Sequence, residues 1–289
     1  MPKVKNLVEN RKIYNSAPLP FVGQKRNFLK HFRALINQHI PDDGENWTIV
    51  DVFGGSGLLA HNAKCLKPKA TVIYNDYDGY TERLKNITDI NRLRQIIYNI
   101  LEPFPKDKRI NDETKQSIIN VIHNFDGYID VRSVSTWLLF SSKQISSIDE
   151  LSKHEMYNNI RLTDYKTADD YLHGLEITSQ SFDKLLPQYY HQPNTLLLLD
   201  PPYICTQQQA YALSKYFGMV KFLTLMQMVR PPYIFFSSTR SELLDYLQYV
   251  EQYEPQTWQR TGGFDKINIQ VTLNGSGANY EDNMIYRFK

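Results

Sequence analysis

The chain carries the stretch Leu196-Leu197-Leu198-Leu199-Asp200-Pro201-Pro202-Tyr203, and this stretch decides the fold that the sequence predicts. Four consecutive leucines are typical of a strand that is buried on both faces of a parallel sheet. An aspartate directly after such a strand lies at the carboxyl edge of the sheet, which is where open α/β sheets bind ligands. The sequence therefore predicts an α/β fold with a ligand site that begins at Asp200.

The residues after this strand combine a carboxylate, two prolines and an aromatic ring. Pro201 and Pro202 have no backbone N–H and hold φ at about −65°, so they present their carbonyls from a stiff segment. Asp200 and these carbonyls could accept the hydrogens of an exocyclic amine, while Tyr203 could contact the face of a planar molecule. Adenine has this shape and chemistry. The same residues also suit an ordinary turn with a packed tyrosine, so the two interpretations stay open at this point.

Length and composition exclude several classes of protein. The 289 residues are enough for one large domain or for a domain with a sizeable insertion. No apolar run reaches membrane-spanning length, and the N-terminus lacks the apolar segment of a signal peptide. Cys65 and Cys205 lie far apart without metal-ligand spacing, which predicts free thiols, no metal and a cytoplasmic protein. A net charge of +2 is too small to indicate a nucleic-acid partner by itself.

A glycine turn follows the first expected strand, residues 48–53. Gly54, Gly55 and Gly57 allow backbone to approach a ligand closely before a helix begins. The turn has neither the spacing of the dinucleotide fingerprint nor the lysine of a phosphate loop. It is typical of a nucleoside site, with a tight turn that binds nothing as the alternative.

An acidic pair follows the second expected strand, residues 71–74. Asp76 lies about 20 residues beyond the glycine turn, which is where a carboxylate would hold a ribose diol. Asp78 is the competing candidate for this role. An aspartate at either position could instead cap the helix that follows.

Residues 79–174 differ in character from the rest of the chain. They are polar, helical and without a run that resembles a core strand, which predicts an inserted domain between residues 1–78 and 175–289. The later core strands are expected at residues 175–179, 195–199, 232–236, 267–271 and 284–288. The cations of the insertion that could contact phosphates are Arg92, Arg94, Lys106, Lys108, Arg109, Arg132, Lys143, Lys153 and Arg161.

Four segments together resemble one family. They are Phe21-Val22-Gly23-Gln24-Lys25, Asp51-Val52-Phe53-Gly54-Gly55-Ser56-Gly57, Asn75-Asp76 and Asp200-Pro201-Pro202-Tyr203. In this order they are similar to the motifs of the Dam-type (class D12, α-group) DNA adenine-N6 methyltransferases, whose target-recognition insertion also separates the second and third strands. The resemblance spans essentially the whole chain and is weakest in the insertion.

Three departures from the family pattern stand out. Phe21 replaces the usual tryptophan and Gln24 the second glycine of the first motif. Ser181 stands before Phe182 where the family often carries an aspartate. The insertion lacks the Arg-x-Asn and Asn-Val-Pro-x-Gly patterns of GATC-specific members, so the target sequence does not carry over.

The resemblance implies a Rossmann-like S-adenosylmethionine-dependent methyltransferase sheet with a mostly helical target-recognition insertion. It implies site-specific methylation of a flipped-out adenine at N6, without a metal. The catalytic residues that it implies are Asp200, Pro201, Pro202 and Tyr203. The S-adenosylmethionine-binding residues that it implies are Phe21, Lys25, Asp51, Phe53, Gly54, Gly55, Gly57, Asp76, Ser181, Phe182 and Asp200.

Double-stranded DNA is the expected partner, and a cognate restriction endonuclease is a candidate second partner. Two other functions remain open: an RNA adenine-N6 methyltransferase, and a DNA-binding regulator without activity on a methyltransferase fold. A nicotinamide oxidoreductase is disfavoured because the dinucleotide glycine spacing is missing. The sequence gives neither the recognition sequence nor the oligomeric state.

Overall fold

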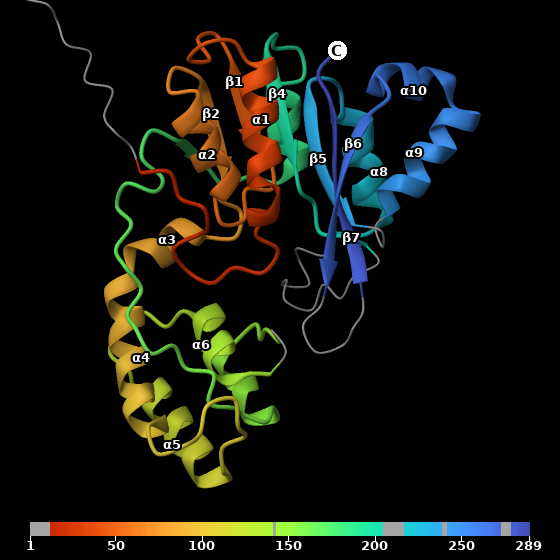
Figure 1. Ribbon diagram of the computed structural model, residues 1–289. Helices are drawn as coiled ribbons and strands as arrows, with labels where there is room; N and C mark the ends of the chain where they lie inside the picture. Colours follow the sequence, from red (N-terminus) through yellow and green to blue (C-terminus); the bar gives the residue numbers. More distant parts are fainter. Residues whose placement is uncertain (1–11, 141–142, 205–216, 239–241, 273–278) are drawn as a thin grey trace, which may run out of the picture.

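The computed structural model describes residues 12–140, 143–204, 217–238, 242–272 and 279–289 (Figure 1). Cys205 falls outside these residues, as do the N-terminal cations Lys3, Lys5 and Arg11 and the glycines at positions 275 and 277. Within the described part of the chain, no helix has both the length and the apolar character needed to cross a membrane.

A seven-stranded sheet forms the centre of the molecule, with the strand order β3-β2-β1-β4-β5-β7-β6. The first five strands in the chain pair in parallel, while β7 is antiparallel to both β5 and β6. This sheet confirms the predicted α/β fold. The strands are β1 Thr48–Asp51, β2 Thr71–Asn75, β3 Glu176–Thr178, β4 Thr195–Leu199, β5 Tyr233–Ser238, β6 Asp265–Thr272 and β7 Asn279–Arg287.

Strand β4 explains why the leucine run is uniform. Successive side chains of a strand point to opposite faces. Leu196 and Leu198 belong to the cluster of buried side chains under α1 and α2, and Leu197 and Leu199 to the cluster under α7, α8 and α9. All five residues of β4 are buried, as the sequence predicts for a central parallel strand.

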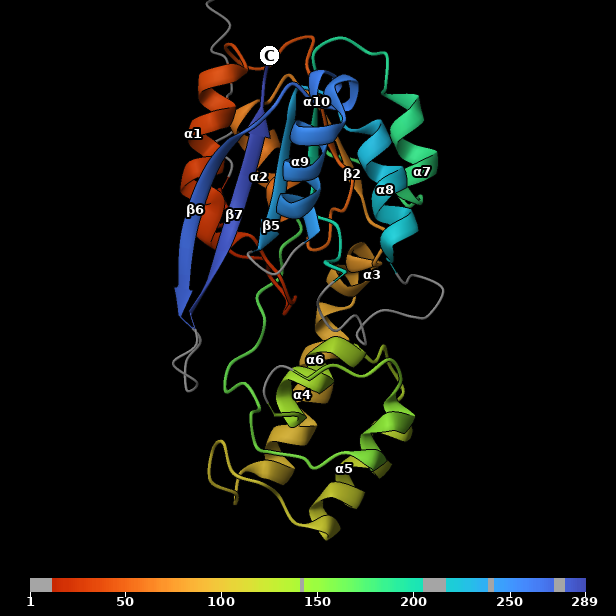
Figure 2. The same cartoon turned by 90° about the vertical axis from the view of Figure 1, so that its right-hand side faces the viewer.

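Helices cover both faces of the sheet, which gives three layers (Figures 1 and 2). On one face lie α1 Leu29–His39, which follows the short 3₁₀ helix η1 Arg26–Phe28, and α2 Leu58–Leu66. On the other face lie α7 Phe182–Leu185, η3 Leu186–Gln188, α8 Met219–Met228, α9 Glu242–Tyr253 and α10 Pro255–Thr261.

Between β2 and β3 the chain forms a lobe of helices, here called the helical lobe (residues 79–174). Figure 1 shows it joined to the sheet through α3. Its described residues contain no named strand, although Arg109 and Tyr157 form an isolated bridge. The described buried side chains of the lobe belong to the same apolar cluster as those under α1 and α2, so the two parts share one core. The helices are α3 Tyr80–Lys85, α4 Ile87–Leu101, α5 Asp112–His123, α6 Val131–Leu138 and η2 Ile148–Lys153.

Candidate active site

A cavity of about 720 Å³ lies at the carboxyl edge of β1, β2 and β4. This size is typical of a site for a cofactor-sized ligand. Its wall includes most of the site residues that the sequence predicts: Phe21, Lys25, Asp51, Phe53, Gly54, Gly55, Ser181, Phe182, Asp200, Pro201, Pro202 and Tyr203. Gly57 and Asp76, which were also predicted to bind the cofactor, are not part of the wall.

The glycine turn is packed so tightly that side chains would not fit. A Cβ added at Gly54 would lie 2.4 Å from the Tyr74 ring and 2.9 Å from the Asn75 carbonyl oxygen. Gly55 has φ of 50°, and the Tyr74 hydroxyl donates to its carbonyl oxygen at 2.8 Å. A Cβ there would be 3.0 Å from the Phe21 ring. The turn therefore presents bare backbone beneath the cavity.

Asn75 was not among the predicted site residues, yet it joins three segments of the cavity wall. Its side-chain N–H groups donate to the carbonyls of Val52 and Gln180, each at 2.8 Å, and its side-chain oxygen accepts from the Gln180 backbone at 2.9 Å. These bonds fix the end of β1 against the segment that leads to Ser181. The position of Asn75 after a buried strand was the only signal for this role in the sequence.

Lys25 and Asp200 form the closest charged contact in the cavity wall that the structure describes. Lys25 Nζ lies 2.6 Å from Asp200 Oδ2 and donates to the Gly23 carbonyl at 3.0 Å. The same ammonium lies 5.8 Å from the centre of the Tyr203 ring. Burial raises the pKa of Asp200, and Lys25 opposes this by favouring the charged carboxylate.

A second carboxyl group lies deeper in the site. Asp51 is 2% exposed, and its Oδ2 accepts a hydrogen bond from the Ala60 backbone at 3.2 Å. Burial, and then the charge of Asp200, raise the pKa of Asp51 to about 7. Lys25 lowers the pKa of Asp51, but by less than burial and Asp200 raise it, so this deep carboxyl favours a proton or a cation beside it.

A third acidic residue of this region was missed by the sequence predictions. Asp282 lies on β7, opposite Ser238 at the end of β5. Burial raises its pKa, Lys25 lowers it, and Asp200 raises it, which indicates that Asp282 shares the field of the ion pair. Its antiparallel strand returns to the edge at which the parallel strands end, and no pattern in the sequence linked Asp282 to that edge.

Three aromatic rings form an apolar corner of the site. Phe53, at the end of β1, lies 5.8 Å from Phe182 and 5.9 Å from Phe217 between ring centres. Phe182 and Phe217 are 5.7 Å apart. All three line the cavity, and such an arrangement offers flat apolar surface to a planar ring.

The two acidic candidates after β2 have different surroundings. The carboxylate of Asp76 accepts from the backbone of Tyr80 at 2.6 Å and of Thr81 at 2.9 Å, which caps the start of α3. Asp78 lines the cavity instead. Its Oδ1 lies 3.7 Å from Arg132 Nη2, and the side chain is 17% exposed.

The segment after Tyr203 is held by a residue that no sequence pattern indicated. Glu242, the first residue of α9, is 8% exposed, and its Oε2 accepts from the Ile204 backbone at 3.0 Å. This bond anchors the chain immediately beyond the proline pair. Among the described residues, no group of three His, Cys, Asp or Glu side chains is placed to hold a metal ion.

Comparison with known proteins gives the context of this site. Residues 21–219 match the model of the D12 class N6 adenine-specific DNA methyltransferase family. A protein of Haemophilus influenzae (strain ATCC 51907 / DSM 11121 / KW20 / Rd), named as a methyltransferase without a stated substrate, is 52% identical over 280 residues, which cover 96% of this chain and 94% of that protein. A crystal structure of precorrin-6y C5,15-methyltransferase from Geobacter metallireducens GS-15 covers 96% of this chain and 100% of its own at 8% identity, but its TM-score of 0.33 is too low to support an argument.

Proposed function

The chain belongs to the D12 class N6 adenine-specific DNA methyltransferase family, and we propose that it transfers a methyl group from S-adenosylmethionine to N6 of an adenine in double-stranded DNA. One observation carries this proposal. Asp200, Pro201, Pro202 and Tyr203 line the same cavity as the glycine turn, although the helical lobe separates the two segments in the chain. An amine-binding segment and a nucleoside-binding turn thus face one space.

The residues of the cavity fit S-adenosylmethionine. The cofactor carries a positive sulfonium and a positive amine, and the deep part of the cavity holds the carboxyl groups of Asp51 and Asp200. Phe53 and Phe182 provide flat apolar surface for its adenine, and Gly54 leaves no Cβ between the ligand and the backbone. When bound there, S-adenosylmethionine supplies an electrophilic methyl group.

For the ribose hydroxyls, the geometry favours Asp78 over Asp76. Both oxygens of Asp76 already accept backbone N–H groups of α3, and the residue is 7% exposed. Asp78 lies two residues further along and lines the cavity. Asp76 would then act indirectly, because it fixes the turn that carries Asp78.

Asp200 and Pro201 would act on the target amine. Their oxygens would accept the two N6 hydrogens, which draws the nitrogen toward tetrahedral geometry and leaves its lone pair available for attack. Lys25 holds Asp200 Oδ2 at 2.6 Å and favours the charged carboxylate, so Oδ1 is left for the amine. The carboxylate charge stabilises the positive charge that develops on N6, and this stabilisation is stronger in the transition state than in the ground state.

Tyr203 would stack on the face of the target adenine. A base inside a duplex cannot reach this cavity, so the adenine must leave the helix, at a cost of roughly a few kcal/mol. Stacking on an aromatic side chain recovers roughly 1–3 kcal/mol for each base.

The helical lobe would contact the duplex. Arg94 is 2% exposed and pairs with Asp164, so it is not available for a phosphate. Arg109 is exposed and pairs with Glu155 at 2.9 Å. Lys108, Lys143 and Lys153 are exposed and remain candidates. A chromosomal substrate would place the enzyme in the cytoplasm, where a restriction endonuclease of the same sequence specificity would be its partner.

The function can be tested with the purified protein and S-adenosylmethionine labelled on its methyl group. Equal concentrations of duplex DNA, single-stranded DNA and RNA of one sequence are compared, and the modified nucleoside is identified by mass spectrometry. We expect N6-methyladenine in the duplex, and none with Asp200→Asn. Methylation of RNA alone would identify an RNA methyltransferase. Binding of S-adenosylmethionine with no methylation of any of the three would indicate a regulator. Long-read sequencing of DNA from an expressing host would then give the target sequence.

A further inference from the structure

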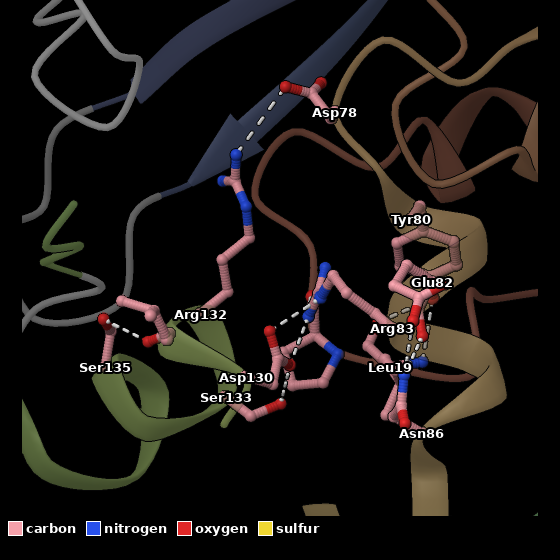
Figure 3. A network of polar contacts seen from close by, with 12 residues as sticks. Leu19, Asp78, Tyr80, Glu82, Arg83, Asn86, Asp130, Arg132, Ser133 and Ser135 are labelled. Carbon is pink, nitrogen blue, oxygen red and sulfur yellow. Dashed lines mark hydrogen bonds and ion pairs between the residues drawn. The ribbon is translucent and has the colours of Figure 1, made fainter. Parts of the chain in front are cut away.

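Arg132 belongs to the helical lobe but lines the cofactor cavity. It is the second residue of α6, and the sequence placed it among cations that could contact phosphates. In Figure 3 its side chain extends from α6 toward Asp78, at the end of the turn after β2. Its guanidinium carbon also lies 5.4 Å from the centre of the Phe21 ring. The lobe therefore contributes one residue to the described cavity wall.

The base of Arg132 is fixed by a buried ion pair. Asp130, two residues before Arg132, accepts two hydrogen bonds from Arg83, each at 2.9 Å, and one from the Ser133 hydroxyl at 2.5 Å. Arg83 and Asp130 are each 4% exposed. Two well-aligned bonds between a guanidinium and a carboxylate fix geometry as well as charge. Arg132 therefore starts from a rigid point at the amino end of α6.

Arg83 also holds the segment that carries Phe21. Arg83 Nη2 donates to the Pro20 carbonyl at 2.8 Å. The Tyr80 hydroxyl accepts from the Leu19 backbone at 2.9 Å and donates to the Leu19 carbonyl at 3.1 Å. Phe21 in turn lies against Gly55 of the glycine turn. Arg132, Phe21 and the glycine turn are thus held in one arrangement.

The guanidinium of Arg132 has little to pair with in this arrangement. Its side chain is 22% exposed, and its one ion pair among the described residues is the 3.7 Å contact with Asp78, which is too long for a hydrogen bond. A guanidinium has five N–H donors in a planar fork that matches a carboxylate. The other cations of the cavity wall are Lys25, which is paired with Asp200, and Lys221, which is exposed on α8.

We propose that Arg132 binds the carboxylate of the methionine part of S-adenosylmethionine, so that the helical lobe supplies a residue of the cofactor site. This inference rests on the proposed function, because it assumes that S-adenosylmethionine is the ligand. The carboxylate is the one anionic group of that ligand. Arg132 is the cation of the described cavity wall that is mostly buried and has no hydrogen-bonded acid, whereas Lys25 is paired with Asp200 and Lys221 is exposed. Binding of cofactor would consequently tie the lobe to the sheet.

The experiment measures affinity by calorimetry without turnover. Arg132→Met keeps an apolar stem beside Phe21 but removes the charge and all five donors. Two probes are titrated: S-adenosylhomocysteine, and its analogue that lacks only the carboxylate. We expect Arg132→Met to weaken S-adenosylhomocysteine binding by roughly 10- to 100-fold, the usual effect of losing bonds to a charged group. The analogue should bind wild type and variant within about twofold.

Arg109→Met is the matched control, because Arg109 lies in the same lobe, is 57% exposed and pairs with Glu155. It should leave both affinities unchanged. Arg132→Lys should recover part of the lost affinity, and both variants are first checked for an unaltered melting temperature. If Arg132→Met does not fold, Arg132→Lys decides the question. Because a lysine lacks the planar fork of donors, this variant should bind S-adenosylhomocysteine more weakly than wild type does and should bind the analogue equally well.

Three results would overturn the inference. Equal loss of affinity for both probes would mean that Arg132 only shapes the cavity. Unchanged S-adenosylhomocysteine binding with weaker duplex binding would assign Arg132 to the DNA. Failure of the wild type to bind S-adenosylhomocysteine would overturn the proposed function as well, and this outcome is distinct because it does not depend on the variant.

Discussion

Asp51→Asn should stabilise the protein while it weakens cofactor binding. Asparagine has the size and shape of aspartate, and its side-chain oxygen can still accept the Ala60 N–H. The substitution removes a charge from a position that is 2% exposed. Burial and Asp200 raise the pKa of Asp51 to about 7. The Asp51 carboxyl group is therefore protonated in the folded protein over a pH range in which it is ionised in the unfolded chain.

The sign of the effect follows from this difference in proton binding. The unfolded chain binds fewer protons than the folded one between the ordinary value of 3.8 and about 7, so wild-type stability falls as pH rises through that window. Relative to wild type, the gain from Asp51→Asn should be about 1.5 kcal/mol at pH 5 and about 4 kcal/mol at pH 8. Above the folded-state pKa the gain should stay constant.

Urea denaturation at pH 5 and pH 8 measures the two free energies of unfolding directly. Asp43→Asn is the matched control, because Asp43 is 61% exposed and should show no gain. Calorimetry with S-adenosylhomocysteine on the same samples should show weaker binding, since the ligand amine loses a negative partner. Equal stability of variant and wild type at both pH values would refute the reasoning, because Asp51 would then be ionised in the folded protein as in the unfolded chain.

Three further predictions concern the cavity. Asp200→Asn should lower the single-turnover methylation rate by orders of magnitude with duplex affinity nearly unchanged, because the carboxylate charge acts mainly in the transition state. Tyr203→Phe should retain most of the rate. A native rate for Asp200→Asn would show that Asp200 is only a turn residue. Asp78→Ala should weaken S-adenosylhomocysteine binding by about 1.5–3 kcal/mol in calorimetry without a change in melting temperature. Asp76→Ala should instead lower the melting temperature, because α3 loses its cap. The reverse pattern would mean that Asp76 binds the ribose hydroxyls. Gly54→Ala should cost about 1–3 kcal/mol in urea denaturation, because its Cβ would overlap the Tyr74 ring, and full stability would show that the ring can move.

The positions of the parallel strands in the chain, and the edge of the sheet at which the cavity lies, could be predicted because they depend on local patterns. The leucines of β4 form a continuous apolar run because both faces of a central parallel strand are covered. Asp200 had to lie at the ligand edge once that strand was placed. The end of β1 was less predictable: the strand stops at Asp51, and Val52 and Phe53 belong to the turn that the glycines require.

The parts of the site that were missed depend on contacts between distant segments. The hydrogen bond from Ile204 to Glu242 and the effect of Lys25 on the pKa of Asp282 both join segments that lie far apart in the sequence. No local pattern therefore marks Glu242 or Asp282. The carboxylate of Asp76 illustrates a different limit. An aspartate after a strand can cap a helix or bind a sugar, and only the backbone of α3 shows that both oxygens are already used.

The helix α10 was not anticipated for a third reason. Pro255–Thr261 has no apolar periodicity, although a proline near the first turn is a recognised start signal for a helix. Its identity as a helix follows from packing against α9 rather than from its own pattern. The division of the chain into two domains and the roles of the site residues stay predictions.

The buried pair of Arg83 and Asp130 has a consequence for exchanging the helical lobe between relatives. A chimera that takes residues 87–174 from a relative would keep Arg83 but could replace Asp130, and an uncompensated buried charge costs about 3–5 kcal/mol. Arg83 also donates to the Pro20 carbonyl, so a change at Asp130 would also affect the position of the segment around Pro20. The unit that can be exchanged between relatives is therefore larger than residues 87–174: it comprises the whole helical lobe, including α3, and the segment around Leu19 and Pro20.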